Sequence, residues 1–129
     1  MVGAFALRRL ARVQVEGTSM MPTLAHGDRL VVIRGARPRC GDIVALKDPG
    51  EPTRLLVKRV VALAPSGVEV RGDNRAASRD SRRFGPVAPS SLLGRAVYRY
   101  SPPTRAGFLG QSASRRGTLV PDGPAPEGY

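Results

Sequence analysis

The chain has 129 residues, and a composition of 41% hydrophobic residues, 15 Gly and 12 Pro leaves room for one modest core and favours short strands over a helical bundle. The formal net charge is +11, but the basic residues are spread along the chain and aromatic residues make up only 5%, so we expect no nucleic-acid partner. The single Cys40 and single His26 are too few for a zinc site or an intramolecular disulfide, so both are taken as structural, with no metal or cofactor.

The chain opens with an apolar run at residues 2–7, followed by Arg8 and Arg9. This run is far shorter than the roughly 20 residues that a membrane-spanning helix needs. Its positive charge follows the apolar run, which reverses the order found in a secretory signal. We therefore expect an N-terminal segment over residues 1–12 without a transmembrane anchor, and peripheral contact with a membrane stays open.

Turn residues divide the middle of the chain into short apolar or alternating runs, as in a β-rich domain. The Gly-Asp pairs at 27–28 and 41–42 each precede a strand, and residues 48–52 and 75–86 are expected to be loops. Residues 53–64 give the strongest strand signal. A tight turn and a short strand within residues 65–74 follow them, which predicts a hairpin. The expected strands lie within residues 13–16, 26–34, 40–47, 53–64, 65–74 and 91–100, the last of these closing the set.

These elements predict a mainly β fold, with a small coiled or closed antiparallel sheet that covers its own edges. The domain core is expected over residues 13–100. Residues 101–129 are rich in Pro, Gly and Ser and show little periodicity, so we expect a disordered tail there.

Ser19 lies after a Gly17-Thr18 turn and three residues before Pro22. On its own, a serine at the start of a short apolar stretch fits a helix N-cap better than a nucleophile. A Ser-His-Asp arrangement would have to use His26, which is close to Ser19 in the chain. The segment alone therefore leaves the role of Ser19 open.

Lys58 lies inside the apolar segment LLVKRVV, in a chain with 19 Arg and two Lys. Strand alternation places Lys58 on one face and Arg59 on the other, so one of them must point toward an apolar side. Only lysine can lose its proton and act as a base, and burial lowers its pKa from about 10.4 in that direction. The alternative is a lysine that extends from a sheet edge into solvent. A serine-lysine pair needs no histidine, so Ser19 and Lys58 together favour a catalytic dyad.

Three segments, in this order, resemble the conserved boxes of the type I signal peptidase family: GTSMMPTL at 17–24, VKRVVA at 57–62 and GDNRAASRDSRRFGPV at 72–87. The Gly-Asp pairs and the GRA at 94–96 fit the same pattern, and the match covers about residues 13–98. The resemblance implies a serine endopeptidase with a β-sheet catalytic core.

Within this resemblance Ser19 matches the nucleophile and Lys58 the general base. Ser78 matches the hydroxyl that orients the lysine amine, and Thr23 matches a second polar neighbour of that amine. The turn at residues 72–74 would bring Ser78 toward the base. Each role is implied by the match of this sequence to the family boxes.

The same resemblance assigns supporting roles around the dyad. Asp80 and Arg82 match a supporting ion pair, and the backbone N–H of Ser19 would donate to the oxyanion. The family's second oxyanion donor is a serine in some members, but here Gly17 occupies that position, which leaves its backbone N–H or Thr18 as candidates. The short stretch between residues 62 and 72 leaves no room for the second β-domain of longer relatives.

A minimal core without an anchor looks like the proteases that mature nickel-type superoxide dismutase. The resemblance implies a cytoplasmic enzyme that removes the N-terminal leader of the superoxide dismutase precursor and holds no nickel itself.

Three other functions remain open. The first is a membrane-associated signal peptidase that uses residues 2–7 and an apolar substrate-contacting rim of Met20, Met21 and Phe84. The second is a self-cleaving repressor of the SOS type, which would need a DNA-binding domain before the core. The third is a basic binding module without catalysis.

Overall fold

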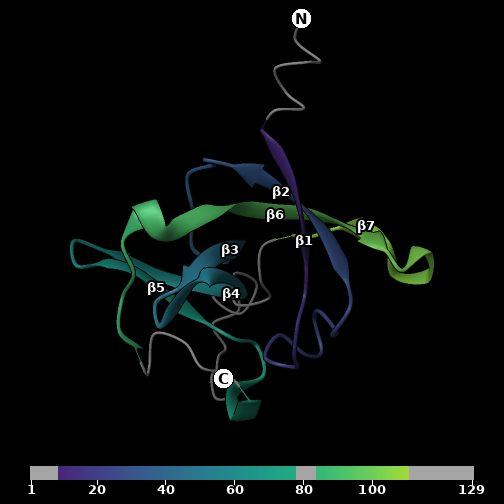
Figure 1. The fold of residues 1–129 in the computed structure, drawn as a ribbon, viewed down its shortest axis with the longest axis horizontal. Helices are drawn as coiled ribbons and strands as arrows, with labels where there is room; N and C mark the ends of the chain where they lie inside the picture. Colours follow the sequence, from purple (N-terminus) through teal and green to yellow (C-terminus); the bar gives the residue numbers. More distant parts are fainter. Residues whose placement is uncertain (1–8, 78–83, 111–129) are drawn as a thin grey trace, which may run out of the picture.

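A computed structural model describes residues 9–77 and 84–110 of the chain. The prediction of a mainly β fold is confirmed, because strands make up about half of the described residues and the other named elements are short 3-10 turns (Figure 1). The strands are β1 (Leu10–Gln14), β2 (Arg29–Arg34), β3 (Ile43–Asp48), β4 (Glu51–Ala64), β5 (Gly67–Arg71), β6 (Leu92–Ser101) and β7 (Gly107–Phe108). Short 3-10 turns η1 (Arg75–Ala77), η2 (Pro89–Ser91) and η3 (Pro103–Arg105) join or follow them.

All strands belong to one antiparallel sheet in the order β1-β2-β6-β3-β4-β5, and β7 pairs with β6. β1 and β5 are the two end strands of this order and do not pair with each other, so the sheet is open. The prediction allowed a coiled or a closed sheet, and the closed alternative is wrong. β6 is its central strand, since it pairs with β2, β3 and β7. Gly94 lies where β6 pairs with β2 and β3 at once, opposite Arg34 on one side and Ala45 on the other.

Buried apolar side chains form two clusters. β3 supplies alternate residues to each, as expected for a central strand covered on both faces. The first core cluster comprises Val13, Val15, Met20, Leu24, Leu30, Val32, Ile43, Ala45, Val57 and Ala96. The second core cluster comprises Val44, Leu46, Val60, Val68, Val70 and Val87.

The order of strands and turns agrees with the sequence prediction, including the hairpin of β4 and β5. The prediction that residues 91–100 form the last strand is wrong, because β7 follows and pairs with Tyr98 and Arg99. η3 and β7 lie in the segment that was expected to be a tail, whereas residues 111–129 lie outside the described residues. Boundaries of the core at residues 13 and 100 stay predictions.

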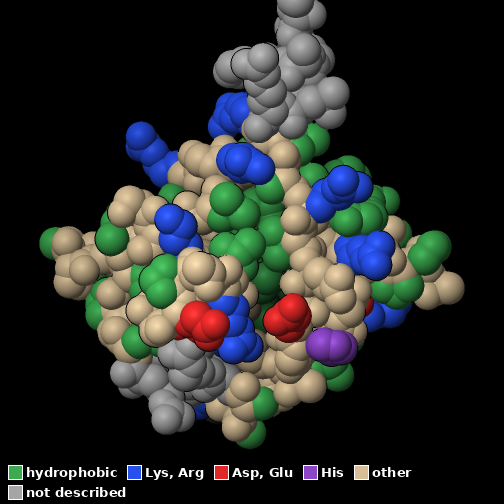
Figure 2. Space-filling view, in the orientation of Figure 1, with side chains coloured by type: hydrophobic (Ala, Val, Ile, Leu, Met, Phe, Trp, Pro, Cys, Tyr) green, Lys and Arg blue, Asp and Glu red, His purple; other side chains and the backbone are tan. Residues whose placement is uncertain are grey.

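Among residues 9–77 and 84–110, no helix has the length and apolar character needed to cross a membrane. The basic side chains on the face in Figure 2 are scattered over the surface and are not gathered into one patch. This distribution agrees with the spread of arginine along the sequence.

Candidate active site

Ser19 lies in the loop between β1 and β2, residues 15–28, which we call the Ser19 loop. Two backbone hydrogen bonds close its base: the Val15 N–H donates to the Asp28 carbonyl, and the Gly27 N–H donates to the Val15 carbonyl, each at 2.8 Å. Inside the loop, the Leu24 N–H donates to the Met20 carbonyl at 2.9 Å. The backbone makes one turn there that does not continue as a helix, so the N-cap interpretation of Ser19 has no helix to cap.

The turn directs its apolar side chains inward. Met20 is 1% exposed and belongs to the first core cluster, so the expectation that it contacts substrate is wrong. Met21, by contrast, is 38% exposed beside Ser19. Phe84 is half-buried and packs against the second core cluster. Of the three apolar candidates, Met21 is the most exposed.

His26 supports the base of the Ser19 loop. The Gly17 N–H donates to its Nδ1 at 2.9 Å, and Gly17 itself has a φ of 81° in the left-handed region. Use of the Gly17 N–H as an oxyanion donor stays a prediction, and it would require this N–H to leave His26 Nδ1. The treatment of His26 as a structural residue agrees with this contact.

Lys58 is buried in β4, with 3% of its surface exposed. It lies opposite Val44 and shares its face with Leu56 and Val60, which belong to or pack against the second core cluster. The neighbouring Arg59 is also buried, at 8% exposed. The expectation that at least one of the two cations points toward an apolar side thus applies to both, because β4 is covered on both faces.

Asp73 compensates the buried charge of Arg59. Arg59 donates from Nε to Asp73 Oδ1 at 2.9 Å and from Nη2 to Asp73 Oδ2 at 2.6 Å, and from Nη1 to the Gly41 carbonyl at 2.9 Å. Such a bidentate arginine-carboxylate pair is among the stronger polar contacts in proteins. It fixes the turn at residues 72–74 against β4, one residue from Lys58.

Asp73 also accepts a hydrogen bond from the Thr23 hydroxyl at 2.5 Å. Burial by itself would raise the pKa of the Asp73 carboxyl, but the hydrogen bonds from Arg59 and Thr23 and the charge of Arg59 outweigh it and lower the pKa below its usual value. The carboxylate is therefore ionised at neutral pH. It joins the Ser19 loop to the strand that carries Lys58.

Asn74 makes a second connection between the 72–74 turn and the Ser19 loop. Its backbone N–H donates to the Ser19 carbonyl at 2.8 Å, and its side-chain amide donates to the Thr18 carbonyl at 3.0 Å. Contacts on both sides of Ser19 hold the backbone that precedes and carries the hydroxyl. The structure thus brings the first and third family-like segments together.

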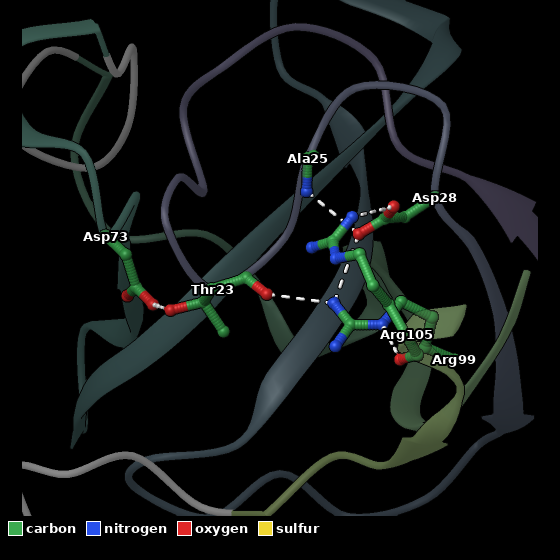
Figure 3. Close-up of polar contacts among 6 residues, drawn as sticks. All are labelled: Thr23, Ala25, Asp28, Asp73, Arg99 and Arg105. Atoms are coloured by element: carbon green, nitrogen blue, oxygen red, sulfur yellow. Dashed lines mark hydrogen bonds and ion pairs between the residues drawn. The ribbon is translucent and has the colours of Figure 1, made fainter. Parts of the chain in front are cut away.

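A cluster of ionised side chains holds the opposite side of the Ser19 loop (Figure 3). Arg99 Nη1 lies 3.0 Å from the Thr23 carbonyl oxygen and 3.1 Å from Asp28 Oδ2. Arg105 Nη1 donates to Asp28 Oδ1 at 2.8 Å, and the Ala25 N–H donates to Asp28 Oδ2 at 2.9 Å. Thr23 is therefore fixed through its side chain by Asp73 and through its carbonyl by Arg99.

Not every predicted site residue can be placed. Ser78, Asp80 and Arg82 lie outside the described residues. Thr23, predicted as a neighbour of the lysine amine, donates its hydroxyl proton to Asp73. Within the described part of the chain, no three His, Cys, Asp or Glu side chains form a group that could hold a metal ion.

The sequence reasoning missed the roles of Arg59, Asn74, Asp28, Arg99 and Arg105. For Asp28 there was a signal, the Gly-Asp pair that directly precedes a strand. For Arg59 the signal was its position in an apolar segment. Nothing in the pattern distinguished Arg99 and Arg105 from the other 17 arginines of the 19.

Comparison with known proteins adds an independent observation. The family model described as "Signal peptidase, peptidase S26" matches residues 1–73 and 69–101. The mitochondrial ATP-independent inner membrane protease subunit 1a of Arabidopsis thaliana is 33% identical over 127 residues, covering 78% of this chain and 76% of its own. The mitochondrial inner membrane protease subunit 2 of Mus musculus is 34% identical, covering 77% and 72%. A probable signal peptidase I-1 of Synechocystis is 28% identical, covering 74% of each chain.

Proposed function

Because this chain belongs to the signal peptidase S26 family and is a serine endopeptidase, we propose that Ser19 is its nucleophile and Lys58 its general base. One observation carries the assignment. Asp73 bridges Thr23, four residues after Ser19, and Arg59, the residue after Lys58. The loop that carries the serine and the strand that carries the lysine are thereby tied through one carboxylate.

The proposed reaction begins with attack of Ser19 Oγ on the peptide carbonyl carbon, while Lys58 Nζ takes the hydroxyl proton. The tetrahedral intermediate collapses as the leaving amine receives that proton, which leaves an acyl-enzyme that water then hydrolyses. Lys58 must be uncharged before attack, and its burial beside Val44 and Val60 supports this by disfavouring the ammonium form.

The Ser19 N–H is the proposed oxyanion donor. The resemblance to the family supports Ser78 as the hydroxyl that orients the Lys58 amine, with Asp80 and Arg82 as a supporting ion pair. Thr23 takes a different proposed role. Because its hydroxyl donates to Asp73, it positions the Ser19 loop.

The proposed substrate is a precursor protein with an N-terminal leader, and specifically the nickel superoxide dismutase precursor in the cytoplasm. The resemblance of the short core to the proteases of that maturation supports this substrate. Met21 and Phe84 are the proposed contacts for residues near the scissile bond.

The first prediction tests substrate and dyad together by co-expression with the nickel superoxide dismutase precursor. We expect the wild-type chain to shorten the precursor, and Ser19→Ala and Lys58→Ala to abolish cleavage while the domain stays folded. Lys58→Arg should fail as well, because a guanidinium stays protonated and cannot accept the hydroxyl proton. Mass spectrometry of the precursor's N-terminus measures the outcome.

Lys47→Arg is the matched control, since it makes the same replacement at an exposed lysine of β3 and should leave cleavage unchanged. Full activity of Lys58→Arg would show that the base is assigned wrongly. An intact precursor beside the wild-type chain would exclude this substrate.

A second substrate class follows from the relatives. One of them is named a probable signal peptidase and two are named inner membrane proteases, which favours secretory or membrane-bound precursors as the alternative. Cleavage of a secretory precursor, together with recovery of the chain in salt-washed membranes, would support that alternative over the cytoplasmic one.

A further inference from the structure

We propose that Arg99 is a positioning residue for the Ser19 loop, holding Thr23 from the side opposite Asp73 so that Ser19 lies where it can attack. The proposal rests on the proposed role of Ser19 as the nucleophile. It adds a residue of β6, outside the family-like segments at 17–24, 57–62 and 72–87, to the groups on which the reaction depends.

Arg99 contacts three separate groups through one guanidinium (Figure 3). Nη1 donates to the Thr23 carbonyl at 3.0 Å and lies 3.1 Å from Asp28 Oδ2, while Nε donates to the Arg105 carbonyl at 2.6 Å. Its side chain is only 16% exposed. The planar guanidinium offers several donors in a fixed geometry, which a lysine ammonium lacks.

Asp28 orients Arg99. Its side chain is 2% exposed, and a carboxylate buried to that extent needs charge compensation and hydrogen bonds. Arg99 and Arg105 supply the charge, and the Ala25 N–H supplies a further hydrogen bond. Because Asp28 fixes the guanidinium, Nη1 of Arg99 is directed at the Thr23 carbonyl.

Thr23 is thus anchored on two sides within the same short turn as Ser19. Without Arg99, Thr23 itself keeps only the Asp73 contact, so the turn can tilt about that contact and about the Asn74 hydrogen bonds to Thr18 and Ser19, and Ser19 shifts relative to Lys58. A displacement of about 1 Å in an active site can lower the rate about 100-fold. We therefore expect loss of Arg99 to lower kcat while the substrate-contacting surface, and with it KM, stays nearly unchanged.

The cluster also gives residues 101–105 a role. Arg105 of η3 pairs with Asp28, and its carbonyl accepts from Arg99. This part of the chain, which composition alone assigned to a tail, completes the support of the Ser19 loop. Arg105→Ala should lower kcat less than Arg99→Ala, because Arg105 contacts Asp28 but not Thr23.

The test uses the full chain and a peptide that spans the leader junction of the nickel superoxide dismutase precursor. Arg99→Ala and Arg99→Lys are compared with Arg29→Ala, which removes an exposed arginine adjacent to Asp28. We expect kcat to fall roughly 10- to 100-fold in both Arg99 variants, with KM within about twofold of wild type. Arg99→Lys should recover most of the thermal stability that Arg99→Ala loses, because a charge next to Asp28 is restored, yet kcat should stay low.

A purely structural role predicts instead that kcat recovers together with stability in Arg99→Lys, and that result would overturn the proposal. So would a kcat of Arg99→Ala equal to that of Arg29→Ala.

Hydrogen exchange of the Met21 and Leu24 amides gives a readout that does not depend on catalysis. We expect protection of these amides to fall roughly tenfold or more in Arg99→Ala but not in Arg29→Ala. If the wild-type chain cleaves nothing, the proposed function fails, and unchanged protection in Arg99→Ala then separately rejects the positioning role.

Discussion

Asp73 shows how much of this site depends on a single side chain. Its Oδ2 accepts hydrogen bonds from both the Thr23 hydroxyl and Arg59 Nη2. Arg59 is buried, so loss of the carboxylate would leave a desolvated guanidinium without its main counter-charge. The same residue therefore stabilises the fold and fixes the Ser19 loop.

The stabilisation by Asp73 should depend on pH. Because its pKa is lower in the folded chain than in the unfolded chain, its contribution is fully present well above the unfolded value of about 3.9. That contribution is lost as pH falls through the lowered folded value. We expect Asp73→Asn to reduce the free energy of unfolding by about 2–3 kcal/mol at pH 6, and by clearly less at pH 3. Urea unfolding at the two pH values measures the difference.

Glu51→Gln, at an exposed position of β4, controls for the loss of a negative charge and should change stability little. An effect of Asp73→Asn that is equal at both pH values would contradict the assignment of an ionised, paired carboxylate.

At the scale of single residues, the sequence predicted chemistry better than orientation. Lys58 was singled out correctly as a buried cation, because lysine in an apolar run of an arginine-rich chain is unusual. Met20 was assigned wrongly, because the one-turn backbone of residues 20–24 rotates it inward, and strand alternation gives no information about such a turn.

Among the elements, β6 carries the largest geometric constraint. A Cβ atom at Gly94 would lie 2.0 Å from the Ile33 carbonyl oxygen, and this oxygen belongs to the backbone of β2. The close approach allows β6 to pair with β2 and β3 at the same residue. Both halves of the sheet depend on this crossing.

We therefore expect Gly94→Ala to destabilise the protein by roughly 1–3 kcal/mol or more, because the clash can be relieved only by moving backbone. Gly107→Ala in β7 is the matched control, since its added methyl group meets no atom within 4 Å. Thermal unfolding monitored by circular dichroism compares the two. Equal melting temperatures would show that β6 can shift away from β2 at little cost.

β2 to β6 could be predicted because each combines apolar residues with Gly, Pro or Asp near its ends, whereas the strand expected at 13–16 begins at Leu10. β7 could not, since two residues carry no periodicity and are held only by pairing with β6. The contacts of Asp28 with Arg99 and Arg105 could not be predicted from the sequence either, because they join residues that are 71 and 77 positions apart. Such long-range pairing leaves no trace in local spacing.

For the whole molecule, the charge of +11 and the proposed site are separate features. Lys and Arg side chains are scattered over the face in Figure 2, whereas the groups around Ser19 are paired with Asp28 and Asp73. A scattered positive charge attracts polyanions without selecting a sequence.

No nucleic-acid partner is expected, so any binding to a DNA oligonucleotide should be non-specific and should weaken steeply between about 50 and 200 mM salt, as counter-ion release requires. Ser19→Ala should leave this binding unchanged and still abolish cleavage. Fluorescence anisotropy and the cleavage assay, run at the same salt concentrations, separate the two properties. Tight DNA binding together with a function that survives Ser19→Ala intact would favour the basic binding module instead.

The groups that contact Thr23 and Asp28 from other elements follow the Ser19 loop in the chain, between residues 73 and 105. Thr23 contacts Asp73, and Asp28 contacts Arg99 and Arg105, and all three partners are synthesised after the Ser19 loop. A nascent chain on the ribosome therefore carries the serine long before the groups that hold it in place have emerged. With Ser19 as the proposed nucleophile, a chain whose synthesis has not reached Arg105 lacks the contacts that position the Ser19 loop, and we expect such a chain to cleave little.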